Sequence, residues 1–326
     1  MDFRTKIDIK HSDYKISHSN NIMLIGSCFT ENIGTKLNEY AFNTIQNPFG
    51  IVYNPQSICD QIIQLIYNLS IEENELFFQN EQWHHYHFHS RFSNSNKTDA
   101  IVAMNNSLEA GHRFLKDADF LIVTLGTAKI YELLQSEGAI ANCHKTPKNK
   151  FKESFLSNDK IFELLKTTLN HLYKFNTNIR VILSISPIRH WKDGAIENLK
   201  SKSILNVATH QIIEQYAKVE YFPAYEIIMD ELRDYRFYKE DMLHPSDTAI
   251  KYIWESFCNT YMSSETMQLN NSILDITNAK NHRPFNEKSE AYSKFINHNY
   301  LKIIELKKAH PYLNIQHLEE FFTQKH

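Results

Sequence analysis

A cysteine and a serine lie where a short apolar run meets an expected helix. Ser27 and Cys28 follow Gly26 in the stretch IMLIGSCFTENIG, residues 22–34. A side chain at such a junction lies near free backbone N–H groups and the positive end of the helix dipole. A thiol in that position loses its proton more readily than a free thiol, whereas a hydroxyl needs a base to activate it. The stretch therefore indicates a nucleophile, and leaves open which of the two residues it is.

A carboxylate and an imidazole lie close together much later in the chain. Asp241 and His244 are separated by two residues in FYKEDMLHPSDTAI (237–250), just before an expected helix that Ser246 begins. In a D-x-x-H turn the carboxylate can hold one imidazole nitrogen and leave the other facing a nucleophile. We therefore expect Asp241 to orient His244, and His244 to act as the base.

Histidines are concentrated in the stretch WHHYHFHSRF, residues 83–92. His85, His87 and His89 alternate, so on a strand they would line one face. Alternating imidazoles can bind a metal ion, but Glu81 is the one acidic residue nearby and aromatic residues interleave, so we expect no metal site. His89 is instead a candidate for substrate contact, and a hairpin without a functional role is the other interpretation.

Three further polar residues follow segments that are expected to contain strands. His144 lies in NCHKTP, and Arg189 and His190 lie in SPIRHW. Residues that follow the carboxyl ends of parallel strands collect in the cleft of an α/β protein. All three are candidates for contact with the substrate, with Arg189 suited to paired hydrogen bonds to an anionic group, and a position on the surface or in the core is the other interpretation. Cys143, beside His144, is a poorer candidate nucleophile because adjacent residues seldom face each other.

Four short apolar runs alternate with helical patterns along the chain. Continuous runs of this kind are typical of strands that are buried on both faces of a parallel sheet. Their alternation with helices predicts a three-layer α/β/α sandwich. The runs are residues 22–25, 119–126, 179–187 and, with a weaker pattern, 219–225.

Amphipathic patterns predict helices between these runs. Thr30 is expected to cap the first helix, with Glu31 in its first turn. Residues 71–98 do not follow this periodicity and are expected to form an inserted hairpin. The expected helices are residues 30–40, 56–69, 102–117, 158–174, 195–217 and 247–262.

The composition becomes more polar after residue 262. Two helical patterns follow, near residues 286–307 and 314–324. We therefore divide the chain into an α/β domain, residues 1–262, and a C-terminal helical extension, residues 263–326. The helices of the extension are a candidate surface for oligomerisation.

Composition and charge exclude several classes of protein. The 326 residues carry a formal net charge of −3, with no basic stripe that would bind a nucleic-acid backbone. No run approaches the roughly 18 apolar residues of a membrane span, and the N-terminus lacks the apolar core of a signal peptide. The 4 cysteines form no C-x-x-C pair. We therefore expect a cytoplasmic protein with reduced thiols.

The stretch GSCFTENIG resembles the signature of the GSCFA domain family, which belongs with the SGNH (GDSL) hydrolases. Together the similar stretches span residues 22 to about 262. The resemblance implies an SGNH-like fold, with a five-stranded parallel sheet of flavodoxin-like topology. The other similar stretches are NPFGIVYNP, WHHYHFHSRF, LGTAKIYE, ANCHKTP, SPIRHWKDG and YFPAYEIIMDELRDYRFYKEDMLHPS.

The first sequence block of SGNH hydrolases reads G-D-S, and the corresponding block here reads G-S-C. The resemblance therefore implies that Cys28 takes the place of the nucleophilic serine and Ser27 that of the aspartate. It favours Cys28 as the nucleophile, with Ser27 as the alternative.

The resemblance also implies where an oxyanion would bind. The N–H of Gly50 corresponds to one donor, and Gly126 opens the block that normally carries an asparagine as another. Ala128 stands in place of that asparagine. Losing one such donor costs about 3–4 kcal/mol of transition-state stabilisation. Asn142 is a candidate replacement, as are Asn47 and the backbone N–H of the nucleophile.

We expect an enzyme of ester or acyl chemistry that needs no cofactor and no metal. Its expected partner is a small-molecule or glycan-linked acyl ester. Because a thiol readily forms thioesters, acyl transfer is as natural an outcome as hydrolysis. The alternative is a non-catalytic protein that keeps the hydrolase pocket to bind a carbohydrate or acylated ligand. A scaffold that oligomerises through its C-terminal helices is a third interpretation.

Overall fold

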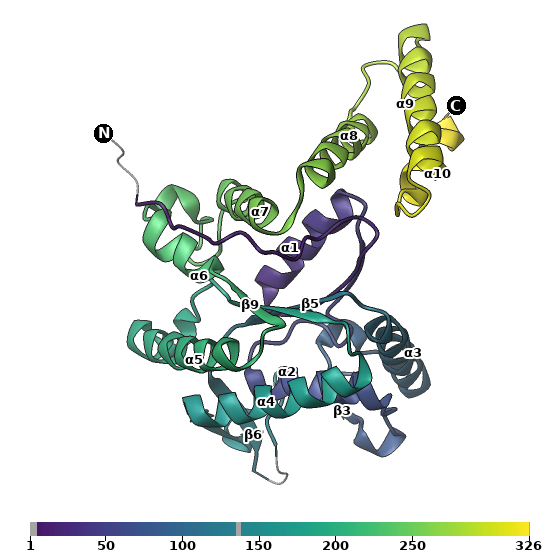
Figure 1. The fold of residues 1–326 in the computed structure, drawn as a ribbon. Coiled ribbons are helices and arrows are strands. Elements are labelled where there is room, and N and C mark those ends of the chain that lie inside the picture. Colours follow the sequence, from purple (N-terminus) through teal and green to yellow (C-terminus); the bar gives the residue numbers. More distant parts are fainter. Residues whose placement is uncertain (1–4, 135–137, 326) are drawn as a thin grey trace.

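A parallel sheet of five strands forms the centre of the computed structural model, which describes residues 5–134 and 138–325 (Figure 1). The strand order is β2-β1-β5-β8-β9, and all neighbouring strands are parallel. This order is the flavodoxin-like one, and it confirms the expected fold class. In sheet order the strands are β2 (Asn43–Gln46), β1 (Asn21–Gly26), β5 (Phe120–Leu125), β8 (Arg180–Ile185) and β9 (Val219–Phe222).

The central strands are buried on both faces. Ile22 and Leu24 of β1 pack into the hydrophobic cluster on one side of the sheet, and Met23 and Ile25 pack into the cluster on the other side. All four side chains are fully buried. This two-sided burial explains why the strands are continuous apolar runs in the sequence.

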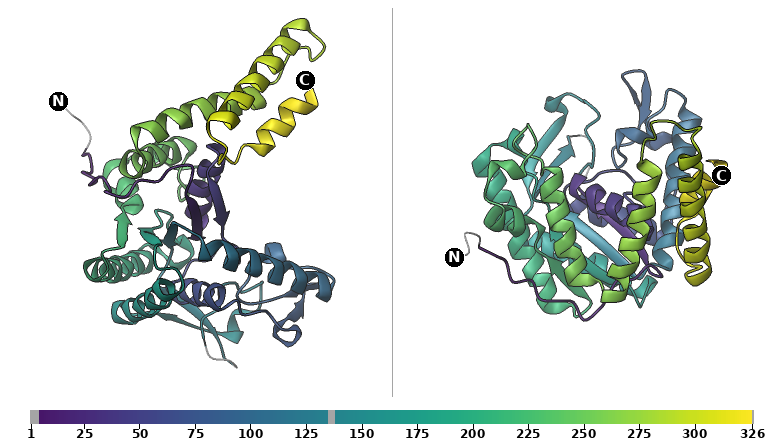
Figure 2. Two further views of the ribbon diagram at one scale, coloured as in Figure 1. Left: turned by 45° about the vertical axis from the view of Figure 1, so that its right-hand side comes forward. Right: turned by 90° about the horizontal axis from the view of Figure 1, so that it is seen from above.

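Helices cover both faces of the sheet and make the three layers of the sandwich (Figures 1 and 2). One face is covered by α1 (Cys28–Glu39) and α7 (Asp247–Tyr261), whose apolar side chains join the cluster of Ile22 and Leu24. The opposite face is covered by α2 (Pro55–Tyr67), α3 (Lys97–Lys116), α4 (Asn158–Phe175) and α5 (Ala195–Gln215).

The edge strand β2 does not correspond to any predicted apolar run. Its sequence NTIQ is mostly polar, and none of its four residues is fully buried. An edge strand pairs on one side only, so it needs no apolar run on both faces. For this reason the sequence shows only four apolar runs, although the sheet has five strands.

The first helix begins two residues earlier than its pattern predicts. Ser27 is its N-cap, and the Ser27 hydroxyl accepts a hydrogen bond from the backbone N–H of Phe29 at 3.3 Å. Thr30, the predicted cap, is buried within the first turn. The correction matters for function because it makes Cys28 the first residue of the helix.

Two small antiparallel hairpins are added to the sandwich. The expected insertion contains the hairpin β3 (Phe77–Gln79) and β4 (Gln82–His84), and a second hairpin, β6 (Lys129–Leu133) with β7 (Phe151–Phe155), was not predicted. Because β4 ends at His84, the alternating histidines that follow lie in turns. The expectation that they line one face of a strand is therefore wrong.

The C-terminal region packs beside α1 as a group of three helices with its own apolar cluster (Figure 2). They are α8 (Ser264–Asn281), α9 (Glu290–Ala309) and α10 (Gln316–Lys325). The sequence pattern missed α8, because its buried face includes the polar residues Thr266 and Asn270 beside Ile273 and Ile276. The division of the chain at residue 262 stays a prediction, as does oligomerisation through these helices. Within the described ranges, no helix has both the length and the apolarity needed to cross a bilayer.

Candidate active site

The backbone turns sharply where β1 meets α1. Gly26 has φ +149°, and its N–H donates to Oδ1 of Asn47 at 2.8 Å. A Cβ atom at Gly26 would lie 2.4 Å from the carbonyl oxygen of Thr124 on the neighbouring strand. A side chain there would force the two strands apart, so the turn that presents Cys28 depends on glycine.

The two candidate nucleophiles differ in their surroundings. Ser27 is only 1% exposed, and its hydroxyl is occupied as the cap of α1. Cys28 is half-buried and lines a cleft of about 950 Å³. A molecule in this cleft would lie beside Cys28, whereas Ser27 is not among the residues that line the cleft.

Tyr53 contacts the sulfur of Cys28 directly. Its hydroxyl oxygen lies 3.3 Å from Sγ. Burial raises the pKa of Tyr53 above its usual range, and the neighbouring Cys28 raises it further. Tyr53 therefore stays a neutral phenol whose O–H can donate to a thiolate. Tyr53 was not predicted as a site residue, although it lies within the stretch NPFGIVYNP.

Gly126 fixes the position of Tyr53. The backbone N–H groups of Gly126 and Thr127 both donate to the carbonyl oxygen of Tyr53, at 2.7 and 3.1 Å. A Cβ atom at Gly126 would lie 3.1 Å from that oxygen and from Cβ of Tyr53, so only glycine allows this approach without a shift. Gly126 itself is not among the residues that line the cleft.

Asp241 and His244 form a pair in the turn before α7. Oδ2 of Asp241 lies 2.5 Å from Nδ1 of His244, and Oδ1 accepts the backbone N–H groups of Leu243 and His244, each at 2.9 Å. The backbone hydrogen bond from His244, followed by those from Leu243 and the His244 ring, lowers the pKa of Asp241 to about 2. The carboxylate therefore stays charged at neutral pH and leaves Nε2 of His244 free.

The cleft brings His244 and Cys28 together, although they are far apart in the sequence. Both residues line it, and Asp241 lines an adjoining pocket on the other side of the turn. In the described structure the sulfur of Cys28 is hydrogen-bonded to Tyr53 and not to the His244 ring. Catalytic hydrogen bonds are often long without substrate and tighten when it binds, so this geometry suits a base that acts on the bound complex.

Four other predicted site residues also line the cleft. They are Asn142, His144, Arg189 and His190. The ring of His190 packs edge-on against Tyr53, with ring centroids 5.3 Å apart. Burial, and after it the nearby charge of Lys202, lowers the pKa of His190 to about 4. His190 is therefore neutral at physiological pH.

Gly50 and His89 lie together but outside the cleft. A Cβ atom at Gly50, where φ is +88°, would lie 2.1 Å from Cβ of His89. The N–H of Gly50 donates to the carbonyl of Asn47 at 2.7 Å, so it does not point toward the cleft. The structure therefore does not place either residue where the sequence analysis expected it.

Asn142 is better placed as a donor to an oxyanion. It lines the cleft, and among the described residues its side-chain amide has no hydrogen-bond partner. Asn47, by contrast, is fully buried. Ala128 is fully buried as well, and its N–H donates to Ser201.

The histidine-rich insertion forms a packed cluster of rings. His84 and His144 lie with ring centroids 4.5 Å apart, and His85 and His87 with centroids 5.2 Å apart. Burial lowers the pKa of His85 to about 3. In the part of the chain that the structure describes, no three or more histidine, cysteine, aspartate or glutamate side chains converge as a metal site.

A buried lysine beneath the cleft was not predicted. Nζ of Lys202 in α5 donates to the carbonyl oxygens of Gly126 and Ser186, each at 2.7 Å. The side chain is 1% exposed, and burial lowers its pKa to about 7. Lys202 thus joins the loops that follow β5 and β8. Lysines are so common on amphipathic helices that the sequence gives no signal for this role.

The fold and the site together define an α/β sandwich with a cysteine after its first strand and an aspartate–histidine turn before its last covering helix. The chain belongs to the GSCFA family, whose model matches residues 21–257. A second model, the C-terminal domain of GSCFA domain proteins, matches residues 273–325. The sequence matches no curated protein.

Solved structures similar to this chain include two carbohydrate esterases. One is a carbohydrate esterase family 3 protein from Talaromyces cellulolyticus, with 10% identity and a TM-score of 0.36 over 77% of this chain and 98% of the other. The other is a family 3 carbohydrate esterase from Clostridium thermocellum, with 12% identity and a TM-score of 0.32 over 78% of this chain and 98% of the other.

Proposed function

We propose that this chain is an esterase or acyltransferase of the SGNH type that uses Cys28 as its nucleophile. The observation that carries the proposal is that Cys28 and His244 both line one cleft, while Asp241 is hydrogen-bonded to Nδ1 of the imidazole. A nucleophile, a base and an orienting carboxylate are the three parts that acyl transfer requires.

The first half-reaction transfers the acyl group to the sulfur. The Cys28 thiol gives its proton to Nε2 of His244, and the thiolate attacks the acyl carbon of the ester. Collapse of the tetrahedral adduct breaks the C–O bond, and the leaving alcohol takes the proton back from the imidazolium. The acyl group is left as a thioester on Cys28.

The second half-reaction frees the enzyme. Water, or the hydroxyl group of an acceptor, gives a proton to His244 and attacks the thioester carbon. The C–S bond breaks, the sulfur recovers the proton, and a carboxylic acid or a new ester leaves. The enzyme thus acts as a hydrolase or a transferase according to which acceptor reaches the cleft.

The developing oxyanion needs hydrogen-bond donors. Ala128 cannot supply one from its side chain, as the asparagine of the family pattern would. We assign this role to the backbone N–H of Cys28, which lies at the start of α1, and to the side-chain amide of Asn142. Asn142 lines the cleft, and its amide has no hydrogen-bond partner in the part of the chain that the structure describes, which supports this assignment. The substrate is a small-molecule or glycan-linked ester. Because a thiol nucleophile must stay reduced, we also propose a cytoplasmic location.

Turnover of 4-nitrophenyl acetate tests the proposal. We expect Cys28→Ala to lower kcat/KM at least 1,000-fold, since the residual rate of such variants comes from binding and oxyanion contacts alone. Cys59→Ala is the matched control, because Cys59 is a buried residue of α2 and lies outside the cleft. Equal activity in the Cys28→Ala and Cys59→Ala proteins would overturn the proposal.

Alkylation by iodoacetamide supplies a readout that needs no substrate. Peptide mass spectrometry separates the four free cysteines, and Cys143 is an internal comparison in the same cleft. Burial raises the pKa of Cys143, so it should react slowly. We expect Cys28 to react at least tenfold faster than Cys143 at pH 7, and His244→Asn to reduce that ratio.

A non-catalytic binding protein is the second candidate function. Ala128 in place of the oxyanion asparagine favours it, because the usual donor is lost while the cleft is kept. Thermal-shift measurements with acetylated sugars separate the two functions. A binding protein keeps its ligand response in Cys28→Ala and shows no turnover in the wild type.

A further inference from the structure

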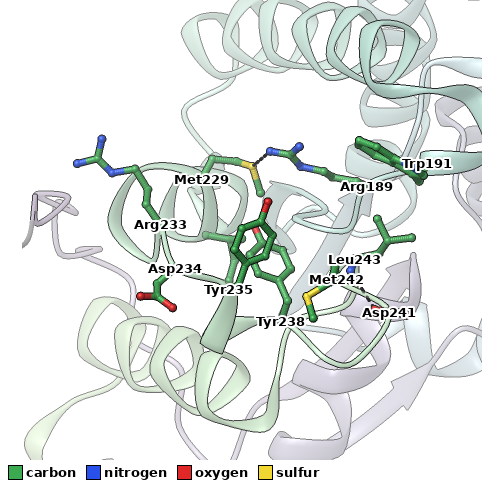
Figure 3. A pocket seen from close by; sticks show the side chains of 11 residues that line it. Arg189, Trp191, Met229, Arg233, Asp234, Tyr235, Tyr238, Asp241, Met242 and Leu243 are labelled. Atoms are coloured by element: carbon green, nitrogen blue, oxygen red, sulfur yellow. Dashed lines mark hydrogen bonds between the residues drawn. The ribbon is translucent and has the colours of Figure 1, made fainter.

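A second hollow adjoins the cleft on the far side of the Asp241–His244 turn. We call it the side pocket; its volume is about 520 Å³ (Figure 3). It shares Arg189, Trp191 and Leu243 with the cleft. A molecule whose reacting bond lies at Cys28 can therefore extend past Arg189 into the side pocket. Its lining also includes Met229, Arg233, Asp234, Tyr235, Asp241 and Met242.

Arg189 lies at the junction of the two hollows with most of its donors unused. Within the described ranges its guanidinium donates one hydrogen bond, from Nη2 to the sulfur of Met229 at 3.2 Å (Figure 3). Thioether sulfur is a weak acceptor. Among the described residues, no carboxylate forms an ion pair with Arg189. A partly buried guanidinium has lost some of its hydrating water, and here a weak hydrogen bond to sulfur replaces it. Such a guanidinium favours an anionic ligand.

The carboxylates that line the side pocket are already engaged. Asp241 binds the ring of His244, and Asp234 binds Arg236 at 2.9 Å. Arg233, on the same wall, donates to the hydroxyl of Thr5 at 3.1 Å. Because Asp234 is paired with Arg236, the two arginines of the lining outnumber the one remaining carboxylate, Asp241, and the side pocket stays net positive.

Large apolar side chains are exposed around this charge. Trp191 is 51% exposed, Tyr235 is 76% exposed and Met242 is 50% exposed. Tyr235 and Tyr238 lie with ring centroids 6.3 Å apart. Exposed aromatic faces beside a cation are suited to a flat or ring-shaped group that carries an anion.

We infer that the side pocket binds the non-reacting part of the substrate, a ring that carries a carboxylate or a phosphate, and that Arg189 binds its anionic group. This inference rests on the proposed function for the position of the ester at Cys28. It adds the substrate class: an ester of an anionic, ring-bearing alcohol.

Binding is tested with three small probes by NMR titration of the intact chain. Benzoate carries a carboxylate on a ring, phenyl phosphate carries a phosphate, and benzamide is a neutral analogue of benzoate. We expect at least one anion to bind about tenfold or more tightly than benzamide, the effect of one charge-assisted hydrogen bond. The tighter anion identifies carboxylate or phosphate as the recognised group.

Variants test whether Arg189 is responsible. Arg189→Gln should abolish the preference for the anion, and Arg189→Lys should restore part of it through charge without the paired geometry. Arg113→Gln on the outer face of α3 is the matched control and should leave the preference unchanged. The inference is overturned if benzamide binds within twofold of both anions, or if Arg189→Gln keeps the preference.

A pair of esters separates failure of this inference from failure of the proposed function. 4-Acetoxybenzoate and methyl 4-acetoxybenzoate have the same acyl group and ring and differ in charge. Faster turnover of the anion, lost in Arg189→Gln, supports both. Equal turnover of the two esters overturns the charge preference and leaves the esterase standing. Selective binding of benzoate or phenyl phosphate without turnover of either ester overturns the esterase and leaves the charge preference standing.

Discussion

Oδ2 of Asp241 lies 2.5 Å from Nδ1 of His244, while Oδ1 of the same carboxylate accepts two backbone N–H groups of the turn. The turn therefore fixes the carboxylate, and the carboxylate fixes the imidazole. A carboxylate that accepts from Nδ1 favours the tautomer with its proton on that nitrogen, which is the tautomer that the proposed base requires.

Replacing Asp241 should disable the base without disturbing the fold. Asp241→Asn offers an amide that can stabilise the wrong tautomer of His244, a change that costs about 10⁴-fold in kcat in a triad enzyme. We expect a loss of this order for 4-nitrophenyl acetate. Asp247→Asn, an exposed carboxylate on the first turn of α7, is the control. Equal rates for the two variants would contradict the role of Asp241.

Tyr53 should stabilise the thiolate of Cys28. Tyr53→Phe removes the hydroxyl that lies 3.3 Å from the sulfur and keeps the ring that packs on His190. Hydrogen bonds to charged groups contribute about 1.5–3 kcal/mol, so Cys28 should be alkylated roughly tenfold more slowly at pH 7. Tyr67→Phe, on the exposed side of α2, serves as the comparison. An unchanged rate in Tyr53→Phe would show that the hydroxyl does not act on the sulfur.

Buried histidines should make the protein sensitive to acid. Burial lowers the pKa of His18 and of His144 to about 4 and that of His85 to about 3, all below the ordinary 6.5. The unfolded chain therefore binds more protons than the folded one between those values, and stability falls as pH falls below 6.5. Each such histidine contributes a slope of about 1.4 kcal/mol per pH unit in that range.

Urea unfolding between pH 4.5 and 8 measures this slope. His144→Asn should reduce it by about one proton, because the amide does not titrate, and should leave stability above pH 7 the least affected. His171→Asn, at the exposed edge of α4, is the control. Identical slopes in the wild type and His144→Asn would show that His144 does not titrate as the structure requires.

Much of the fold follows from local patterns, and so does the Asp241–His244 pair. The strands β1, β5 and β8 are continuous apolar runs because both faces are buried, and the pair lies within one turn. The helix α8 and the strand β2 could not be predicted, because neither has an apolar pattern of its own and both are stabilised by packing against other parts of the fold. Thr266 and Asn270 lie on the buried face of α8, and polar residues on that face hide the amphipathic pattern.

The rest of the site depends on contacts between distant segments. Tyr53 reaches Cys28 because Gly126 lets two backbones approach, and no spacing in the sequence expresses this. Gly50 illustrates the opposite case. A family resemblance assigned its N–H to the oxyanion, but the turn at Asn47 uses that N–H internally.

Lys202 should be a major contributor to stability. Lys202→Met leaves the carbonyls of Gly126 and Ser186 without their donor in a buried site, which costs about 1–3 kcal/mol for each unpaired group. Lys200→Met on the same helix replaces an exposed lysine paired with Glu197, and should change stability by less than about 0.5 kcal/mol. Urea unfolding of both variants measures the difference. A Lys202→Met protein as stable as Lys200→Met would contradict the structural role.

The central claim is that Cys28 carries the acyl group between the two half-reactions. Rapid acid quench of the protein during turnover of 4-nitrophenyl acetate, followed by peptide mass spectrometry, tests it directly. We predict one acetyl group, sensitive to hydroxylamine, on the peptide that contains Cys28, and its loss in Cys28→Ala. Acetylation of Ser27, or continued turnover by Cys28→Ala at the wild-type rate, would contradict it.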